Sequence, residues 1–107
     1  MNNRRAFIVG IKSRKLQSKE KSFLRKYKPW GVILFTRNIK DIKQTLRLTT
    51  SIRKIFNDTR YPILIDQEGG RVNRLKNIIT FDNLTSEFFG NKYLKNFMEF
   101  KLFYKLF

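Results

Sequence analysis

The sequence contains no cysteine and no histidine, and each absence excludes a class of chemistry. Without cysteine the chain can form no disulfide and offers no thiolate to a metal, which fits a reducing compartment. Without histidine it cannot run imidazole acid/base catalysis or ligate zinc through imidazole on its own. We therefore expect no metal site in this chain.

Long apolar runs are also missing. No stretch approaches the roughly 20 apolar residues of a membrane-spanning helix. The first apolar run, Ala6–Gly10, is shorter than the roughly 7–15 residues of a secretory signal, and no small-residue cleavage site follows it. The expectations are a cytoplasmic location and no membrane partner.

Acidic residues are scarce, with 8 Asp and Glu against 24 Lys and Arg and a net charge of +16. Such an excess often indicates nucleic acid or an anionic membrane as partner. Here the basic residues are spread from Arg4 to Lys105 without a run of five, which favours a solvated basic surface. A small basic nucleic-acid-binding module stays open as an alternative, and its affinity would fall steeply with salt.

The 107 residues suffice for one domain with a modest core. Short apolar runs rich in branched side chains predict buried strands, and apolar residues at three- and four-residue spacing predict helices. The expected strands are Ala6–Gly10, Gly31–Phe35 and Ile63–Ile65, and the expected helices are Ser18–Tyr27, with Ser18 as cap, and Ile42–Asn57, with Asp41 as cap.

The stretch Gly31–Asp66 has the length of a strand, a crossover helix and a second strand. Such units are almost always right-handed with parallel strands. We therefore predict an α/β fold in which Asn38 and Asp66 lie at the same end of a parallel sheet. The remaining stretch, Ser86–Phe107, is rich in lysine and phenylalanine and predicts one long helix, with an interruption at Gly90.

The stretch Ile63–Leu75 reads ILIDQEGGRVNRL, an apolar run that stops on a carboxylate. The carboxyl ends of strands are where α/β folds build their sites. Asp66 and Glu68 could form the acid/base pair of a glycosidase, or Asp66 could cap a loop or pair with an arginine. If a sharp loop folds Arg74 back towards Asp66, the two side chains could grip sugar hydroxyls.

The other polar residues nearby are ambiguous. Gly69-Gly70 could form a backbone nest for an anion or a simple turn, and the missing GK[ST] ending disfavours a nucleotide loop. Arg71 is an ordinary surface charge in the simpler interpretation. Arg37-Asn38 forms a second polar pair at a strand end, with the same two interpretations.

Two motifs in order, GVILFTRNI at Gly31–Ile39 and IDQEGGRVNRL at Ile65–Leu75, resemble glycoside hydrolase family 3. The resemblance is to its bacterial beta-N-acetylhexosaminidases of cell-wall recycling, and it covers about Ala6–Leu75. It implies a (β/α)8 barrel, of which this chain supplies a partial TIM-barrel sector of about three parallel strands with crossover helices. Residues 1–85 would then be the N-terminal part of the barrel domain and 86–107 a helical tail, degenerate or truncated.

The resemblance also implies a function, the hydrolysis of O-glycosyl bonds with removal of terminal N-acetylglucosamine from muropeptides and no cofactor. The positions matching Asp66 and Arg74 bind the sugar, and Glu68 becomes a supporting residue, so the paired-carboxylate interpretation is dropped. The family's acid/base histidine, beyond a KHxPGHG segment, and its later nucleophilic aspartate have no counterpart here.

We therefore expect no catalytic residue in this chain, and a partial sugar-binding subsite that is inactive alone. In a further alternative, the chain is one half of a split barrel enzyme, and a second polypeptide supplies the rest of the barrel.

Overall fold

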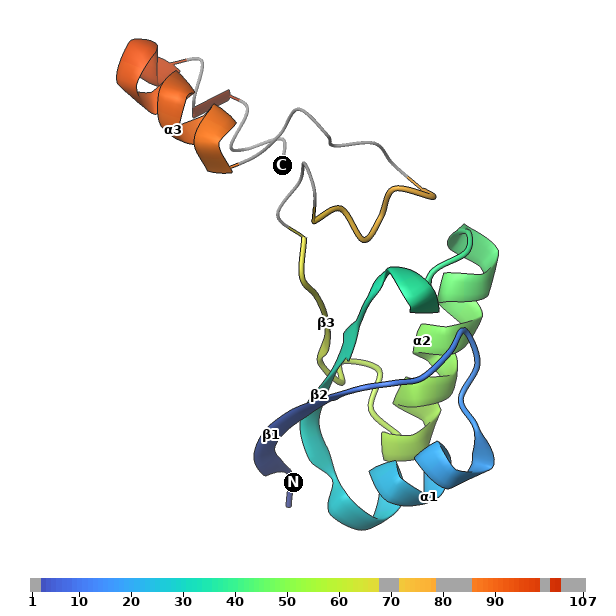
Figure 1. The fold of residues 1–107 in the computed structure, drawn as a ribbon. Coiled ribbons are helices and arrows are strands. Elements are labelled where there is room, and N and C mark those ends of the chain that lie inside the picture. Colours follow the sequence, from blue (N-terminus) through green and yellow to red (C-terminus); the bar gives the residue numbers. More distant parts are fainter. Residues whose placement is uncertain (1–2, 68–71, 79–85, 99–100, 103–107) are drawn as a thin grey trace.

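The computed structural model describes residues 3–67, 72–78, 86–98 and 101–102. Over these residues the chain forms a three-stranded sheet with two covering helices, and a third helix apart from them (Figure 1). In chain order the elements are β1 (Arg5–Gly10), α1 (Ser18–Tyr27), β2 (Pro29–Leu34), the short 3-10 helix η1 (Thr36–Asn38), α2 (Ile42–Phe56), β3 (Ile63–Ile65) and α3 (Ser86–Lys95).

The sheet has the order β1-β2-β3, and both pairs of strands are parallel. Ile8 pairs with Gly31 and Val32 with Ile63, so β2 lies in the middle. Gly31 is required by close packing, because a Cβ added there would lie 2.9 Å from Leu64 Cδ1. The predicted α/β fold with about three parallel strands and crossover helices is confirmed.

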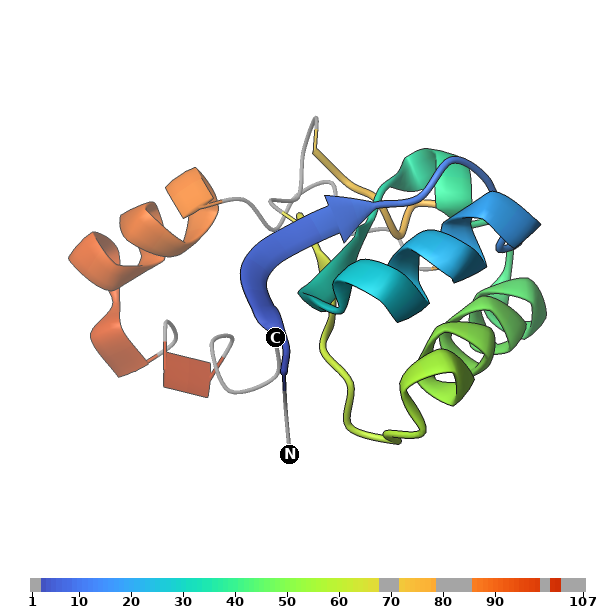
Figure 2. The ribbon, with the colours of Figure 1, turned by 90° about the horizontal axis from the view of Figure 1, so that it is seen from below.

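Both α1 and α2 cover the same face of the sheet (Figure 2). The alternation along β2 turns Val32 and Leu34 towards these helices, which contribute Leu24 from α1 and Leu48 and Ile52 from α2. Each such side chain, fully buried, stabilises the fold by about 1.5–3 kcal/mol. Together with Ile11, Leu16, Ile39 and Tyr61, these residues form the hydrophobic core.

The opposite face of the sheet is less protected. Alternation along the strands places Ile8, Ile33 and Leu64 there, and Ile8 is 46% exposed. Our prediction that all three strands are buried is therefore wrong for β1 and β3, which are only partly buried. They are the edge strands of the described sheet, and burial of an edge strand depends on neighbours that local sequence does not reveal.

The helix ends follow local chemistry. Glu20 caps α1 by accepting from the backbone N–H of Gln17 (2.9 Å) and of Lys12 (2.7 Å), so Gln17 and not Ser18 is the capping position. Asp41 caps α2 as predicted, since its side chain accepts from Gln44 N at 2.8 Å.

The third helix, α3, lies apart from the sheet (Figure 1) and has no buried residue. It runs through Gly90 without the predicted interruption but ends at Lys95, so the prediction of one long helix over Ser86–Phe107 is wrong. Leu94 on it is 81% exposed. No helix among the described residues is long and apolar enough to cross a membrane. The division into residues 1–85 and 86–107 stays a prediction.

Candidate functional site

The candidate site lies at the carboxyl end of the parallel strands. Gly10 ends β1, Phe35 follows β2, and Asp66 follows β3. Residues 72–78 then return to the same end, where Leu75 and Ile78 pack against the core. Parallel pairing thus brings together segments that are far apart in the sequence, as predicted for the ends of β2 and β3.

Asp66 and Arg74 face each other at this end. Arg74 Nη2 lies 3.7 Å from Asp66 Oδ2, which is an ion pair but is longer than a hydrogen bond. The Asp66 side chain is 44% exposed and that of Arg74 is 27% exposed. The predicted fold-back of Arg74 is therefore seen, and both groups keep capacity for a ligand. The other motif residues, Glu68, Gly69, Gly70 and Arg71, lie outside the described residues.

Gln67 holds the return segment in place, and sequence reasoning missed it. Its side-chain oxygen accepts from the backbone N–H of Arg74 at 2.9 Å and of Leu75 at 3.3 Å. Its amide nitrogen donates to Asn73 Oδ1 at 2.9 Å, and Asn73 is buried. These bonds fix the position of Arg74 relative to Asp66, the residue immediately before Gln67. No signal in the sequence separated Gln67 from the other polar residues of the motif.

An aromatic ring supports the arginine. The guanidinium carbon of Arg74 lies 5.4 Å from the centre of the Phe35 ring, and that of Arg37 lies 4.8 Å from it. Gly10 leaves room for this group, because an added Cβ would lie 3.2 Å from Phe35 and 3.3 Å from Arg37. Arg74 Nε is buried and has no hydrogen-bond partner in the described part of the chain. The contact with the Phe35 ring helps to position Arg74, and the exposed part of its guanidinium group is what a ligand could reach.

Asn38 proves to be a structural residue. It is fully buried, and its amide nitrogen donates to the backbone oxygens of Ile11 (3.1 Å) and Ser13 (2.8 Å). Its side-chain oxygen accepts from Phe35 N at 2.9 Å. Arg37 likewise donates through Nε to Ile11 O at 3.1 Å. Of the two interpretations of Arg37-Asn38, the structural one therefore holds for Asn38, which ties the loop after β1 to the loop after β2.

Within the residues that the structure describes, no group of three or more acidic side chains could hold a metal ion. Among the described residues, Asp66 and Arg74 are the carboxylate and guanidinium that face each other at this end of the sheet, and both are partly exposed. Such a pair can accept from and donate to neighbouring hydroxyl groups of one ligand. The geometry therefore suits recognition of a polyhydroxylated molecule.

Comparison with known proteins gives this geometry a family context. The chain is 38% identical over 76 residues to a beta-hexosaminidase of Psychromonas ingrahamii and 43% identical over 72 residues to that of Hydrogenovibrio crunogenus. These matches cover 71% and 64% of this chain, but only 22% and 19% of the relatives. No model of a protein family matches the sequence.

Solved structures agree with the sequence matches. NagZ from Neisseria gonorrhoeae in complex with N-trifluoroacetyl-D-glucosamine superimposes with a TM-score of 0.62 at 34% identity, over 73% of this chain and 22% of that one. A glycoside hydrolase family 3 beta-N-acetylglucosaminidase from Paenibacillus sp. gives a TM-score of 0.62 at 27% identity, over 70% of this chain and 15% of that one.

Fold and sequence therefore define this chain as a glycoside hydrolase homologue. More closely, it is homologous to a segment of the beta-hexosaminidases of glycoside hydrolase family 3, as the two motifs indicated. The chain spans about a fifth of the length of the curated relatives it matches. It thus corresponds to one sector of a larger architecture.

Proposed function

We propose that Asp66 and Arg74 form part of a sugar-binding subsite for a terminal N-acetylhexosamine. The observation that carries the proposal is the 3.7 Å approach of the two side chains at the carboxyl end of the strands. Support comes from the NagZ relative, whose structure holds N-trifluoroacetyl-D-glucosamine.

The 3.7 Å separation of Arg74 and Asp66 leaves both side chains able to bond to a ligand that lies between or beside them. A close ion pair must lose its short hydrogen bonds before it can bind a sugar, whereas a 3.7 Å pair has made none. Sugar hydroxyls both donate and accept, so one can donate to Asp66 while its neighbour accepts from Arg74. Gln67 and Phe35 would hold Arg74 in place and reduce the entropy lost on binding.

In the wider proposal, this sector belongs to a beta-N-acetylhexosaminidase that cleaves O-glycosyl bonds in cytoplasmic peptidoglycan recycling. The chain has no histidine, and the nucleophile and acid/base expected from the resemblance would come from the rest of the barrel. Residues 1–85 would then form the barrel sector and 86–107 a separate helical tail. Alone, the chain would bind sugar weakly and catalyse nothing.

The test is a titration of the isotopically labelled chain with N-acetylglucosamine, followed by amide NMR. We expect saturable shifts at Asp66, Gln67 and Arg74, with a Kd of about 1 mM or weaker because only part of a subsite is present. Asp66→Asn and Arg74→Gln should each weaken binding about tenfold, by loss of a charge-assisted hydrogen bond.

The matched control is Lys43→Gln, an exposed position on α2 that should leave the titration unchanged. Glycerol at equal concentration controls for unspecific hydroxyl binding. Shifts spread over the surface, or insensitive to both site variants, would contradict the subsite. Release of p-nitrophenol from its N-acetyl-beta-glucosaminide by the purified chain would contradict the proposed inactivity.

One observation favours the split-barrel alternative. In the described sheet β1 and β3 each pair on one side only, and Ile8 on the uncovered face is 46% exposed. A second polypeptide that supplies further strands would pair with the free edges of β1 and β3 and would cover Ile8. Pull-down with the tagged chain tests this, and recovery of no KHxPGHG-bearing polypeptide counts against it.

A further inference from the structure

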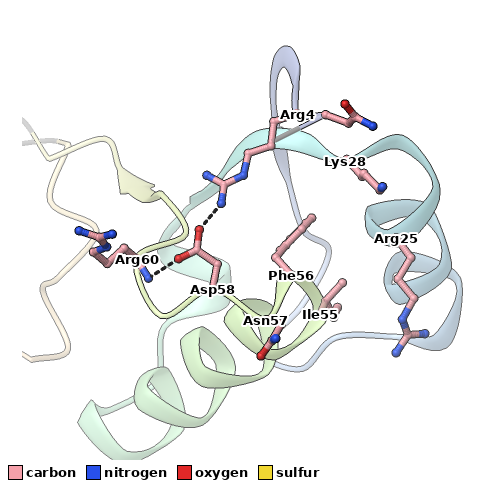
Figure 3. Close-up of a pocket in the computed structure, with 9 residues that line it drawn as sticks. Arg4, Arg25, Lys28, Ile55, Phe56, Asn57, Asp58 and Arg60 are labelled. Atoms are coloured by element: carbon pink, nitrogen blue, oxygen red, sulfur yellow. Dashed lines mark hydrogen bonds and ion pairs between the residues drawn. The ribbon is translucent and has the colours of Figure 1, made fainter. Parts of the chain in front are cut away.

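A basic cleft lies at the other end of the sheet, away from Asp66 and Arg74. It encloses about 810 Å³ and is lined by the segment before β1, the end of α1, the end of α2 and the loop that leads to β3 (Figure 3). Its charged residues are Arg4, Arg25, Lys28, Asp58 and Arg60. Four positive charges therefore surround one negative charge, and neither the motifs nor the proposed sugar subsite uses any of them.

The single carboxylate of the cleft is already neutralised. Asp58 Oδ2 accepts a charge-assisted hydrogen bond from Arg4, and Asp58 Oδ1 accepts from Arg60 N at 2.8 Å. The Arg4 guanidinium also lies 4.8 Å from the centre of the Tyr61 ring. Figure 3 shows Arg4 and Asp58 pointing towards each other on one side of the cleft. The net charge of this pair is zero.

The other side of the cleft carries charge that is not compensated. Arg25 and Lys28, on the α1 side in Figure 3, are exposed, and no carboxylate among the described residues pairs with either. Cations at the C-terminus of a helix often only complement its dipole, which is worth about half a negative charge at that end. The ends of α1 and α2 together supply about one such charge. Arg25 and Lys28 supply two positive charges, more than the two helix ends offset.

The floor of the cleft is apolar. Ile55 and Phe56 line it, and the Phe56 ring stacks on Tyr61 at a centroid distance of 3.8 Å with the planes 5° apart. A ligand matched to the cleft therefore carries a strong negative charge next to an apolar group. We propose that this cleft binds the phosphate of a small phosphate monoester, with its apolar part on Ile55 and Phe56.

The experiment is NMR titration of the full chain with phenyl phosphate at low salt, with inorganic phosphate and a short single-stranded DNA as separate arms. We expect saturable shifts at Arg4, Lys28 and Asp58, and at least threefold tighter binding of phenyl phosphate than of inorganic phosphate. Equal affinity for the two phosphates would overturn the role of the apolar floor. Saturable binding of the DNA at the cleft without binding of either phosphate would overturn the small-molecule proposal.

Two double variants distinguish binding in the cleft from unspecific attraction of phosphate to a highly positive chain. Arg25→Gln/Lys28→Asn removes two charges from the cleft, and asparagine tolerates the left-handed backbone of Lys28 (φ 47°). Lys21→Gln/Lys43→Gln removes two charges from exposed helical positions outside the cleft. The first should weaken phenyl phosphate binding at least tenfold and the second less than twofold. Equal losses in both variants would overturn the proposal, as would no saturable binding in the wild-type chain. Circular dichroism confirms that both variants are folded.

Discussion

The two ends of the sheet each carry one arginine–aspartate pair, and the pairs are built differently. At the amino end Arg4 and Asp58 make a direct hydrogen bond, and the Asp58 carboxylate also accepts from Arg60 N. At the carboxyl end Arg74 and Asp66 approach only to 3.7 Å, and Arg74 Nε has no partner among the described residues. The first pair has satisfied its hydrogen bonds within the protein, and the second has not.

This difference distinguishes a structural ion pair from one that can bind a ligand, by the hydrogen bonds that each pair already makes within the protein. Each oxygen of Asp58 already accepts a hydrogen bond within the protein, so Asp58 offers a ligand fewer free acceptor sites than Asp66 does. Gln67 and Phe35 hold Arg74 near Asp66 by contacts with its backbone N–H and the centre of its guanidinium group, and Arg74 Nη2 stays 3.7 Å from Asp66 Oδ2. Burial alone does not make this distinction, because hydrogen-bond saturation decides what remains available.

The largest effect should come from Asn38, the fully saturated polar residue at the carboxyl end. Asn38→Ala removes three hydrogen bonds and leaves the oxygens of Ile11 and Ser13 and the N–H of Phe35 without that partner. We expect a loss of about 2–4 kcal/mol in the free energy of unfolding. Urea denaturation followed by circular dichroism measures it. The exposed neighbour Lys40→Ala should change stability by less than about 0.5 kcal/mol, and an equally small effect of Asn38→Ala would refute the structural role.

A smaller effect should separate the two arginines. Arg4→Met loses its stacking on Tyr61, worth about 0.5–2 kcal/mol, together with its bond to Asp58. Arg74→Met loses a long, partly exposed ion pair and a contact with the Phe35 ring at 5.4 Å, which is longer than the 4.8 Å between Arg4 and Tyr61. It should therefore cost less stability than Arg4→Met, about 0.5–1 kcal/mol, while it weakens sugar binding. Thermal unfolding of both variants compares their stability, and titration with N-acetylglucosamine compares their sugar binding. If Arg74→Met destabilised the chain as much as Arg4→Met, the two pairs would not differ in kind.

Sequence reasoning predicted the features of this fold that depend on local patterns. The apolar run at Gly31 and the cap at Asp41 specify β2 and the start of α2 because backbone preference and local hydrogen bonding act over a few residues. The degree of burial of β1 could not be predicted in this way. It depends on which strands lie beside it, and the described sheet ends there.

The candidate sites, too, could be predicted from the sequence only where they depend on local patterns. Asp66 stood out because a charge directly after an apolar strand is costly without a use, and Arg74 because a sharp loop could fold it back towards Asp66. The role of Gln67 depends on the return of residues 72–78, a tertiary feature that leaves no mark at Gln67 itself. The basic cleft draws Arg4, Arg25 and Asp58 from three separate segments, so in the sequence its charges looked like part of a uniform basic surface.

The pH dependence of stability should sharpen the comparison further. The backbone N–H of Arg60, and then the Arg4 side chain, hold the pKa of Asp58 below its ordinary value of 3.8. A lowered pKa in the folded state means that the stabilisation is present above pH 3.8 and is lost as the pH falls through the folded-state pKa. Urea midpoints measured from about pH 5 to about pH 2 should therefore fall less for Asp58→Asn than for the wild-type chain.

Arg4→Met distinguishes the two causes of this pKa shift. Because the hydrogen bond from Arg60 N is the largest single cause and stays in place, this variant should retain part of the difference in pH dependence between the wild-type chain and Asp58→Asn. Identical pH profiles of the wild-type chain and Asp58→Asn would show that the saturated pair does not form in solution. The contrast between the two ends of the sheet would then be lost, since an unsaturated Asp58 would be as available to ligands as Asp66.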